Sequence, residues 1–121
     1  MSKEKIDNIM IINDKAIHGF FNEYRFLSNY HLCDIVYEDI SYTSTEAAYQ
    51  AAKFLDQQLR KMFSTRIPSE AKKAGQFTGL REDWEEVKRQ VMFDVCYYKF
   101  SKHSDLRDLL LKTGDKYLEE T

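Results

Sequence analysis

Glycine and proline are scarce in this chain, which has four glycines and one proline among 121 residues. An average protein of this length has about fourteen of the two together. Few tight turns are therefore encoded, and an all-β barrel or sandwich is disfavoured. Hydrophobic residues make up 43% and charged residues 31%, a globular balance that excludes disorder as the main state. The length suffices for one domain and is too short for two ordinary ones.

Cysteine is also rare. Cys33 and Cys96 stand far apart in the sequence and form neither a zinc signature nor a redox pair. We expect both to be buried free thiols. The histidines, at positions 18, 31 and 103, have no metal-ligand spacing. We therefore expect no metal and no cofactor.

Long apolar runs and a strong charge of one sign are absent as well. The longest clearly apolar run covers residues 9–12, against about 20 residues for a membrane span. The start, MSKEKIDN, lacks the apolar core of a signal peptide. We therefore expect a cytoplasmic protein with no membrane partner. A formal charge of −2 argues against a general nucleic-acid binder, although a local phosphate pocket needs only two or three cations.

The order of sequence patterns predicts an α+β domain that is mostly helical, with a small N-terminal β-sheet. The polar residues 1–8 are expected to be flexible, and residues 9–121 to form the domain. Strand patterns cover residues 9–12 and 16–21, with a turn at 13–14, and residues 33–42 alternate as a strand or hairpin does.

Helical patterns follow Tyr42. Thr43 and Glu46 match the N-cap and N3 positions of a capping box, and the helix is predicted to run to residue 58. Further helices are expected at 59–63, at 68–74 with Pro68 in the first turn, from an N-cap at Asp83 with Glu86 at N3 through Tyr98, and from Ser104 to a stop at Gly114. The first helix carries a stripe of residues expected to be packed: Ala48, Ala51, Ala52 and Leu55.

Glu46 and Lys53 are the first candidates for chemistry. A carboxylate in the first turn of a helix lies near the positive end of the helix dipole and can stabilise a developing cation or align a water. The capping box also explains a glutamate there. Lys53 follows two helical turns later on the same face and could contact a phosphate or hydroxyl, whereas most helix lysines are simply solvated.

Two further segments could wall a polar pocket. Ser28 and Asn29 lie among aromatic residues and could bind a nucleoside through hydrogen bonds; an Asx-turn inside an aromatic core is the structural alternative. Arg81 and Trp84 stand where a loop meets a helix. Arg81 could bind a phosphate and Trp84 could stack on a base or sugar, or the pair could be a helix start with a core tryptophan.

These segments resemble, in the same order, the motifs of the NADAR family. Phe21 with the run Phe-Leu-Ser-Asn-Tyr at 26–30 is similar to the family's aromatic Ser-Asn-aromatic signature. The run STEAAYQAAKF at 44–54 resembles the family's Ser-x-Glu-x-x-aromatic-Gln-x-x-Lys helix, and LREDWEEVK at 80–88 continues the match. The resemblance covers residues 17–120.

The resemblance implies an N-glycosidase that hydrolyses a ribosyl C–N bond. Its substrate would be an aminopyrimidine ribose phosphate of riboflavin synthesis or an ADP-ribosylated base, including one in nucleic acid. Glu46 would be the catalytic carboxylate, and the substrate would be bound by Phe21, Ser28, Asn29, Lys53, Arg81 and Trp84. The alternative is a non-catalytic domain that binds an ADP-ribose or NAD-type nucleotide.

One departure from the family concerns the C-terminal end. Family members usually continue beyond the position of Glu120 into a Trp-Gly and Gly-rich segment and a final helix, which carry an acidic and an aromatic pocket residue. This chain ends at Thr121, so we expect a C-terminally short domain. A split enzyme, completed by a second chain or by oligomerisation at the open edge, is a further alternative.

Overall fold

The computed structural model describes residues 16–76 and 79–119. These residues form two compact units, which we treat separately: a terminal unit (Met1–Ser28 with Asp105–Thr121) and a central unit (Asn29–Ser104). The predicted flexible residues 1–8, the strand at 9–12 and the turn at 13–14 lie outside the described residues.

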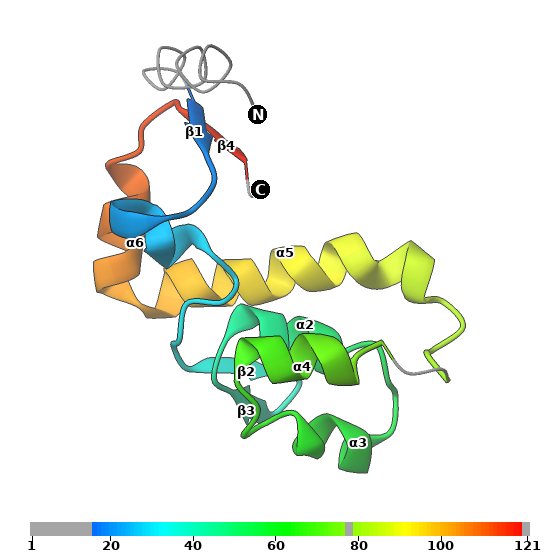
Figure 1. Cartoon of the computed structure of the whole chain (residues 1–121). Helices are drawn as coiled ribbons and strands as arrows, with labels where there is room; N and C mark the ends of the chain where they lie inside the picture. The colour runs from blue at the N-terminus through cyan, green and yellow to red at the C-terminus, as the bar shows by residue number, and fades with distance from the viewer. Residues whose placement is uncertain (1–15, 77–78, 120–121) are drawn as a thin grey trace. The chain divides into compact units, whose positions relative to one another are not determined.

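The terminal unit joins the two ends of the described chain through a parallel strand pair. Strand β1 (Ala16–His18) pairs with β4 (Tyr117–Glu119), so that Ile17 faces Leu118 (Figure 1). The 3-10 helix η1 (Asn22–Leu27) follows β1, and α6 (Ser104–Leu111) precedes β4 and lies in this unit from Asp105 onward. The strand after Ala16 and the helix from Ser104 were predicted, whereas β4 was not.

The central unit begins with an antiparallel hairpin of β2 (Ile35–Tyr37) and β3 (Ile40–Tyr42), in which Ile35 pairs with Tyr42. Its two turn residues, Glu38 and Asp39, have φ angles of 46° and 71°. Positive φ at both positions is what a two-residue type I′ turn requires, and it matches the right-handed twist of the strands. The hairpin predicted at residues 33–42 is therefore confirmed.

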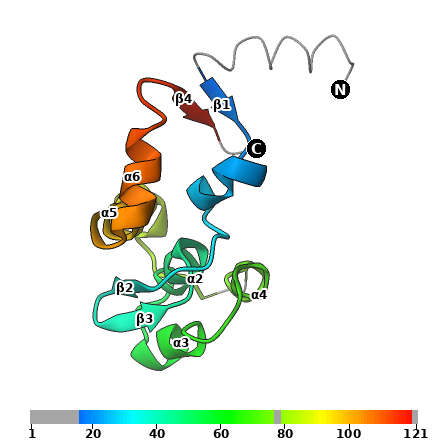
Figure 2. The same ribbon diagram turned by 90° about the vertical axis from the view of Figure 1, so that its left-hand side faces the viewer.

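Four helices complete the central unit: α2 (Thr45–Ala51), α3 (Gln57–Met62), α4 (Pro68–Ala74) and α5 (Trp84–Lys102). Helix α2 contacts the other three helices and both strands of the hairpin, and Figures 1 and 2 show it enclosed by them. The core contains Ile35, Tyr42, Ala47, Ala48, Ala51 and Val95. Small alanines on α2 allow its neighbours to approach closely. The fold is α+β and mostly helical, as predicted.

The predicted capping box at the start of α2 is wrong by one residue. Ser44 is the N-cap, and its Oγ accepts a hydrogen bond of 3.0 Å from the Ala47 N–H. The Thr43 hydroxyl instead donates to the Arg66 carbonyl at 2.9 Å, in the loop before α4. Glu46 consequently occupies N2 rather than N3, and its side chain is available for another partner.

The predicted end of this helix is also wrong, because α2 stops at Ala51 instead of continuing to residue 58. Asp56 begins a new helix, α3, by accepting a hydrogen bond of 2.8 Å from the Gln58 N–H. Leu55 therefore lies in the connection and is 64% exposed, not part of the packed stripe. The short helices predicted near 59–63 and at 68–74 are confirmed as α3 and α4.

Candidate functional site

The first turn of α2 is tied to Asn29 by three hydrogen bonds. The Glu46 N–H donates to the Asn29 carbonyl at 3.1 Å. The Thr45 hydroxyl donates to the Asn29 side-chain oxygen at 2.8 Å and contacts the Asn29 carbonyl at 3.3 Å. Asn29, predicted to bind substrate, thus lies beside Glu46 and orients the backbone that carries it.

The carboxylate of Glu46 lies in a nearly buried position. Glu46 is 8% exposed, and its Oε1 accepts a hydrogen bond of 2.8 Å from Nε2 of Gln50, one helical turn further along α2. A buried carboxylate without such a donor would be strongly destabilised. Gln50 has no role in the sequence-based predictions, although its spacing of four residues from Glu46 places the two on one helix face.

Lys53 and Trp84 come together just beyond the end of α2. The Lys53 Nζ lies 6.0 Å from the centroid of the Trp84 ring and donates to the Gly75 carbonyl at 3.2 Å. The Tyr49 ring meets Trp84 edge-on, with centroids 5.1 Å apart. A cation over a ring face gains from the ring quadrupole. Trp84 is itself 6% exposed and packs with Ala52 and Val91, as the alternative of a core tryptophan predicted.

The charge of Glu46 acts on two of these groups. Burial lowers the pKa of Lys53, the Glu46 charge partly counters this by raising it, and Lys72 lowers it further. The pKa of Tyr49 is raised by burial, lowered by Lys88 and raised by Glu46. The Glu46 charge therefore reaches both Tyr49 on α2 and Lys53 just beyond its end.

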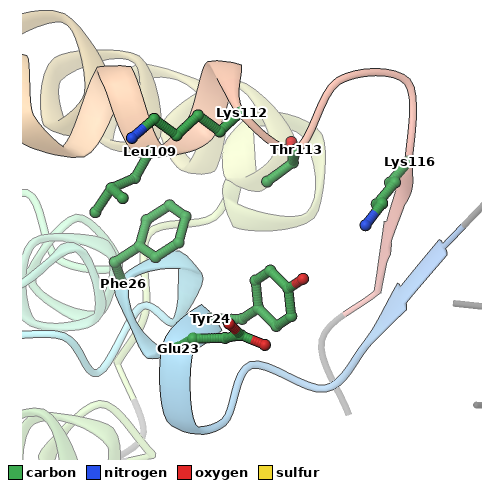
Figure 3. Close-up of a pocket in the computed structure, with 7 residues that line it drawn as sticks. All are labelled: Glu23, Tyr24, Phe26, Leu109, Lys112, Thr113 and Lys116. Carbon is green, nitrogen blue, oxygen red and sulfur yellow. The ribbon is translucent and has the colours of Figure 1, made fainter. Parts of the chain in front are cut away.

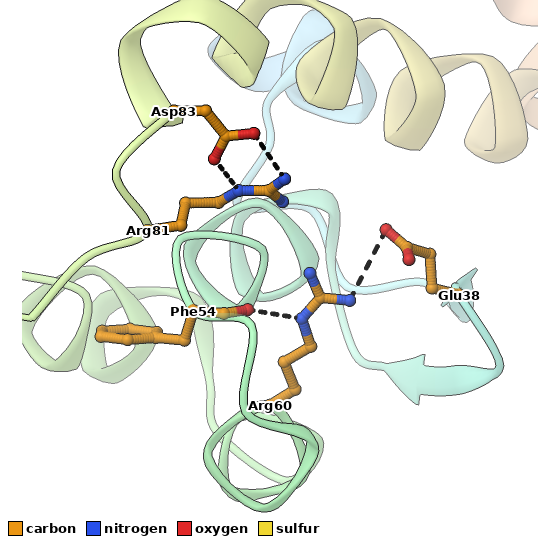
Figure 4. Close-up of polar contacts among 5 residues, drawn as sticks. All are labelled: Glu38, Phe54, Arg60, Arg81 and Asp83. Carbon is orange, nitrogen blue, oxygen red and sulfur yellow. Dashed lines mark hydrogen bonds and ion pairs between the residues drawn. The ribbon is translucent and has the colours of Figure 1, made fainter.

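Arg81 is engaged by a neighbouring carboxylate. Its Nε and a terminal nitrogen donate to the two carboxylate oxygens of Asp83 at 2.6 and 2.9 Å (Figure 4). This pairing lowers the pKa of Asp83 and raises that of Arg81. Asp83 is the N-cap of α5, as predicted, but its side chain makes no capping hydrogen bond to the helix. A phosphate at Arg81 would compete with Asp83.

Arg60 is a buried cation that the sequence did not single out. It is 2% exposed, its Nε donates to the Phe54 carbonyl at 2.7 Å, and a terminal nitrogen lies 3.5 Å from the Glu38 carboxylate (Figure 4). Its guanidinium lies 5.8 Å from the centroid of the Tyr37 ring. Arg60 thus connects α3, the hairpin turn and the chain after α2, so its role is structural.

Phe21 and Ser28 belong to the terminal unit, whereas the Glu46 cluster belongs to the central unit. Phe21 is 61% exposed at the start of η1. Ser28 is buried and caps the end of η1 through its N–H, which donates to the Arg25 carbonyl at 3.0 Å. Their assignment to the substrate site stays a prediction.

The terminal unit contains a cavity of its own, of about 190 Å³, between η1 and the end of α6 (Figure 3). Its walls are the aromatic and apolar side chains Tyr24, Phe26 and Leu109 and the polar side chains Glu23, Lys112, Thr113 and Lys116. Lysines near the C-terminal end of a helix are favoured by the helix dipole alone. This cavity therefore singles out no ligand class.

The described residues show neither a metal-binding cluster nor a membrane-spanning helix. Residues 16–76 and 79–119 contain no group of three or more His, Cys, Asp or Glu placed to hold a metal ion. None of their helices is both long enough and apolar enough to cross a bilayer. Cys33 and Cys96 are thiols not joined in a disulfide, as predicted, but both are half-buried rather than buried.

Comparison with known proteins places this arrangement in a family. The NADAR domain model matches residues 13–121. An N-glycosidase of Nostoc punctiforme is 35% identical over 103 residues, covering 80% of this chain and 66% of that protein. The N-glycosidase YbiA of Escherichia coli is 32% identical over 120 residues, covering 97% of this chain and 75% of YbiA.

The fold agrees with these sequence matches. The NMR structure of Escherichia coli YbiA superimposes with a TM-score of 0.77 at 34% identity, over 88% of this chain and 67% of that one. A riboflavin biosynthesis protein of Vibrio vulnificus is 32% identical over 98 residues, which cover 78% of this chain and 27% of that protein. This chain thus spans about two thirds of the Nostoc relative and a smaller part of the Vibrio one. The chain belongs to the NADAR domain family.

Proposed function

We propose that this protein is an N-glycosidase that hydrolyses the bond between C1 of a ribose and the nitrogen of a base or amine. The observation that carries the proposal is the nearly buried Glu46 carboxylate, which is held by Gln50 and whose charge partly counters the lowering by burial of the pKa of Lys53, just beyond the end of α2. The relatives named N-glycosidases, at 32–35% identity, support the same reaction class.

The proposed chemistry follows from the charge that develops during cleavage. When the C1–N bond breaks, its electron pair leaves with the nitrogen and the sugar ring becomes an oxocarbenium-like cation. A carboxylate such as Glu46 beside C1 stabilises that cation. Water adds to C1, and one of its protons ends on the departing nitrogen. The products are a free ribose derivative and a free base, so atoms and charge balance without a cofactor.

The neighbours of Glu46 would bind the rest of the substrate. Lys53 is suited to a ribose hydroxyl or a phosphate, and the ring of Trp84, although buried, is the one proposed to lie against the base. Asn29 lies beside the first turn of α2, because it accepts hydrogen bonds from the Thr45 hydroxyl and from the Glu46 N–H. Arg81 completes the proposed binding set within the central unit.

For the substrate, we propose an aminopyrimidine ribose phosphate of riboflavin synthesis. The relative from Vibrio vulnificus that is named a riboflavin biosynthesis protein supports this choice. An ADP-ribosylated base is the second substrate to test, because it presents the same ribosyl C–N bond.

The test is hydrolysis followed by mass spectrometry in water enriched in ¹⁸O. The purified chain is incubated with the aminopyrimidine ribose phosphates and, separately, with DNA containing ADP-ribosylated guanine. We expect release of the free pyrimidine and one ¹⁸O atom in the ribose phosphate. Release only from the DNA would overturn the riboflavin assignment. Binding of ADP-ribose or NAD without turnover of either substrate would replace hydrolysis by a nucleotide-binding role.

A further inference from the structure

Gln50 is the polar side chain of the Glu46 cluster that the proposed chemistry has not yet used. It is 5% exposed and lies in the last turn of α2. Its Nε2 donates to Oε1 of Glu46 at 2.8 Å. A donor fixed on one carboxylate oxygen restricts rotation of the group and so determines where the second oxygen points.

The other end of the Gln50 amide is not explained by stability. Its Oε1 is buried and has no hydrogen-bond partner among the described residues. A buried acceptor without a partner costs free energy, and an apolar side chain of similar size would avoid that cost. We therefore assign the role of this amide to its nitrogen, which holds the Glu46 carboxylate.

Gly75 provides the space for this amide. A Cβ added to Gly75 would lie 3.1 Å from the Gln50 Cβ, 2.8 Å from its Cδ and closer still to its Oε1. The backbone of Gly75 has φ −72° and ψ −4°, an ordinary helical conformation that any residue adopts. Close approach, and not backbone geometry, is therefore what requires glycine at this position.

The end of α4 also fixes Lys53. The Gly75 carbonyl accepts a hydrogen bond of 3.2 Å from Lys53 Nζ, while the Gly75 N–H is anchored to the Ala71 carbonyl at 2.9 Å. Because Gly75 cannot move without breaking the last turn of α4, it is a rigid support for both polar side chains.

We propose that Gln50 and Gly75 are a pair of positioning residues that fix the orientation of the Glu46 carboxylate. Gln50 acts directly through its amide, and Gly75 acts through Gln50 by leaving room for it. Their effect on orientation is independent of the substrate. Their effect on rate rests on the proposed function.

The packing half of the proposal is tested by a double-mutant cycle in thermal stability. Gly75→Ala in the wild-type background forces the Gln50 amide aside and is expected to lower Tm by about 5–10 °C. In a Gln50→Ala background, residue 50 keeps only its Cβ as a contact for the new methyl group. Gly75→Ala is therefore expected to lower Tm by less than half as much in that background. Equal losses in the two backgrounds would overturn the role of Gly75.

The orientation half is tested by NMR of the Gln50 side-chain amide. The Nε2 proton signals are expected to shift when Glu46→Ala removes the acceptor and when Gly75→Ala displaces the amide. Unchanged signals in both variants would overturn the proposal whether or not the chain is an enzyme.

Turnover separates this proposal from the proposed function. Gln50→Leu is expected to lower kcat at least tenfold, because a misplaced catalytic group costs rate, with KM changed less than threefold. In a Glu46→Gln background, Gln50→Leu is expected to cause no further loss. A wild-type kcat in Gln50→Leu would overturn the role of Gln50. Absence of turnover in the wild type would overturn the proposed function alone, and the cycle and the NMR signals would still decide the positioning pair.

Discussion

Helices α2 and α5 lie in the same unit but bury their residues in different ways. Six of the seven residues of α2 are buried, and three of these six, Thr45, Glu46 and Gln50, are polar. Helix α5 has nineteen residues, of which four are buried: Trp84, Val91, Val95 and Lys99. These four are spaced by seven, four and four residues, as expected for one face of a helix.

The difference between the two helices separates residues that pack the core from residues that could act on a substrate. In α5, three of the four buried residues are apolar and lie in the core clusters, and Lys99 is the buried polar exception. In α2, the buried polar groups need specific partners, namely Asn29 for Thr45 and Gln50 for Glu46. Buried polar networks are costly when incomplete. We therefore expect substitutions on the buried apolar face of α5 to change stability alone, and substitutions at the polar positions of α2 to change function as well as stability.

The largest stability effect is expected on the packed face of α5. Val95 is fully buried, and Val95→Ala removes two carbon atoms and leaves a cavity, so the free energy of unfolding should fall by about 2 kcal/mol. The matched control is Phe93→Ala on the same helix. Phe93 is 61% exposed and stacks only on Tyr97 among the ring contacts described, so its loss should stay near 0.5 kcal/mol. Urea unfolding measures both, and similar losses would contradict the one-sided packing of α5.

A smaller stability effect is expected for the hydroxyl of Thr45. Thr45→Val keeps the shape of the side chain but removes the donor to the Asn29 side-chain oxygen. Losing one such hydrogen bond should lower the free energy of unfolding by about 1 kcal/mol. Thr43→Val is the control, because its hydroxyl donates to the Arg66 carbonyl and not to Asn29. If Thr45→Val alone slows the hydrolysis as well, the Asn29 contact serves the site; if neither variant does, it serves only the fold.

The smallest effect is a change in titration. Because the Glu46 charge raises the pKa of Lys53 and Lys72 lowers it, Glu46→Gln should lower that pKa further and Lys72→Met should raise it. NMR titration of the Lys53 side chain measures both shifts. Shifts of the same sign in the two variants would contradict the placement of Lys53 between the two charges.

The shifted pKa values of Lys53 and of two buried tyrosines predict a pH dependence of stability. The pKa of Lys53 is lower in the folded chain than its ordinary value of 10.5. At pH values between the folded-state pKa and 10.5, the unfolded chain therefore binds more protons than the folded chain, and the free energy of unfolding rises with pH. Tyr37 and Tyr42 act in the opposite direction, because burial raises the pKa of each to about 12 and their stabilising effect is lost as pH rises from about 10 to 12. Comparison of the wild type with Lys53→Met isolates the lysine; an unchanged difference between them across this window would contradict the shift.

Much of the central unit followed from the sequence. Alternation predicted the hairpin, Pro68 predicted the start of α4, and apolar spacing predicted α5. The end of α2 was missed because residues 52–58 contain no glycine or proline to mark it, although Asp56 is of a residue type that favours an N-cap. The cap was misplaced because Thr43 and Ser44 are both good N-caps, and the contact of Thr43 with Arg66 lies 23 residues away.

The site was predicted in part. Glu46, Lys53 and Trp84 were expected together. The structure brings Lys53 and Trp84 into contact just beyond the end of α2, whereas Glu46, in the first turn of α2, acts on Lys53 through its charge. The contact of Gln50 with Gly75 was not predictable, because it depends on how α2 packs on α4. Strand β4 was missed for a similar reason: a three-residue strand has little pattern of its own, and its partner is about 100 residues away in the sequence.

The central claim is that Glu46 carries the hydrolysis, and the most direct measurement is kcat of Glu46→Gln on the aminopyrimidine ribose phosphate. The matched control is Glu85→Gln, which changes an exposed glutamate in the first turn of α5. We predict that Glu46→Gln lowers kcat about 10²–10⁴-fold with Tm little changed, while Glu85→Gln retains the wild-type rate. A Glu46→Gln variant that keeps more than a tenth of the wild-type kcat would contradict the account.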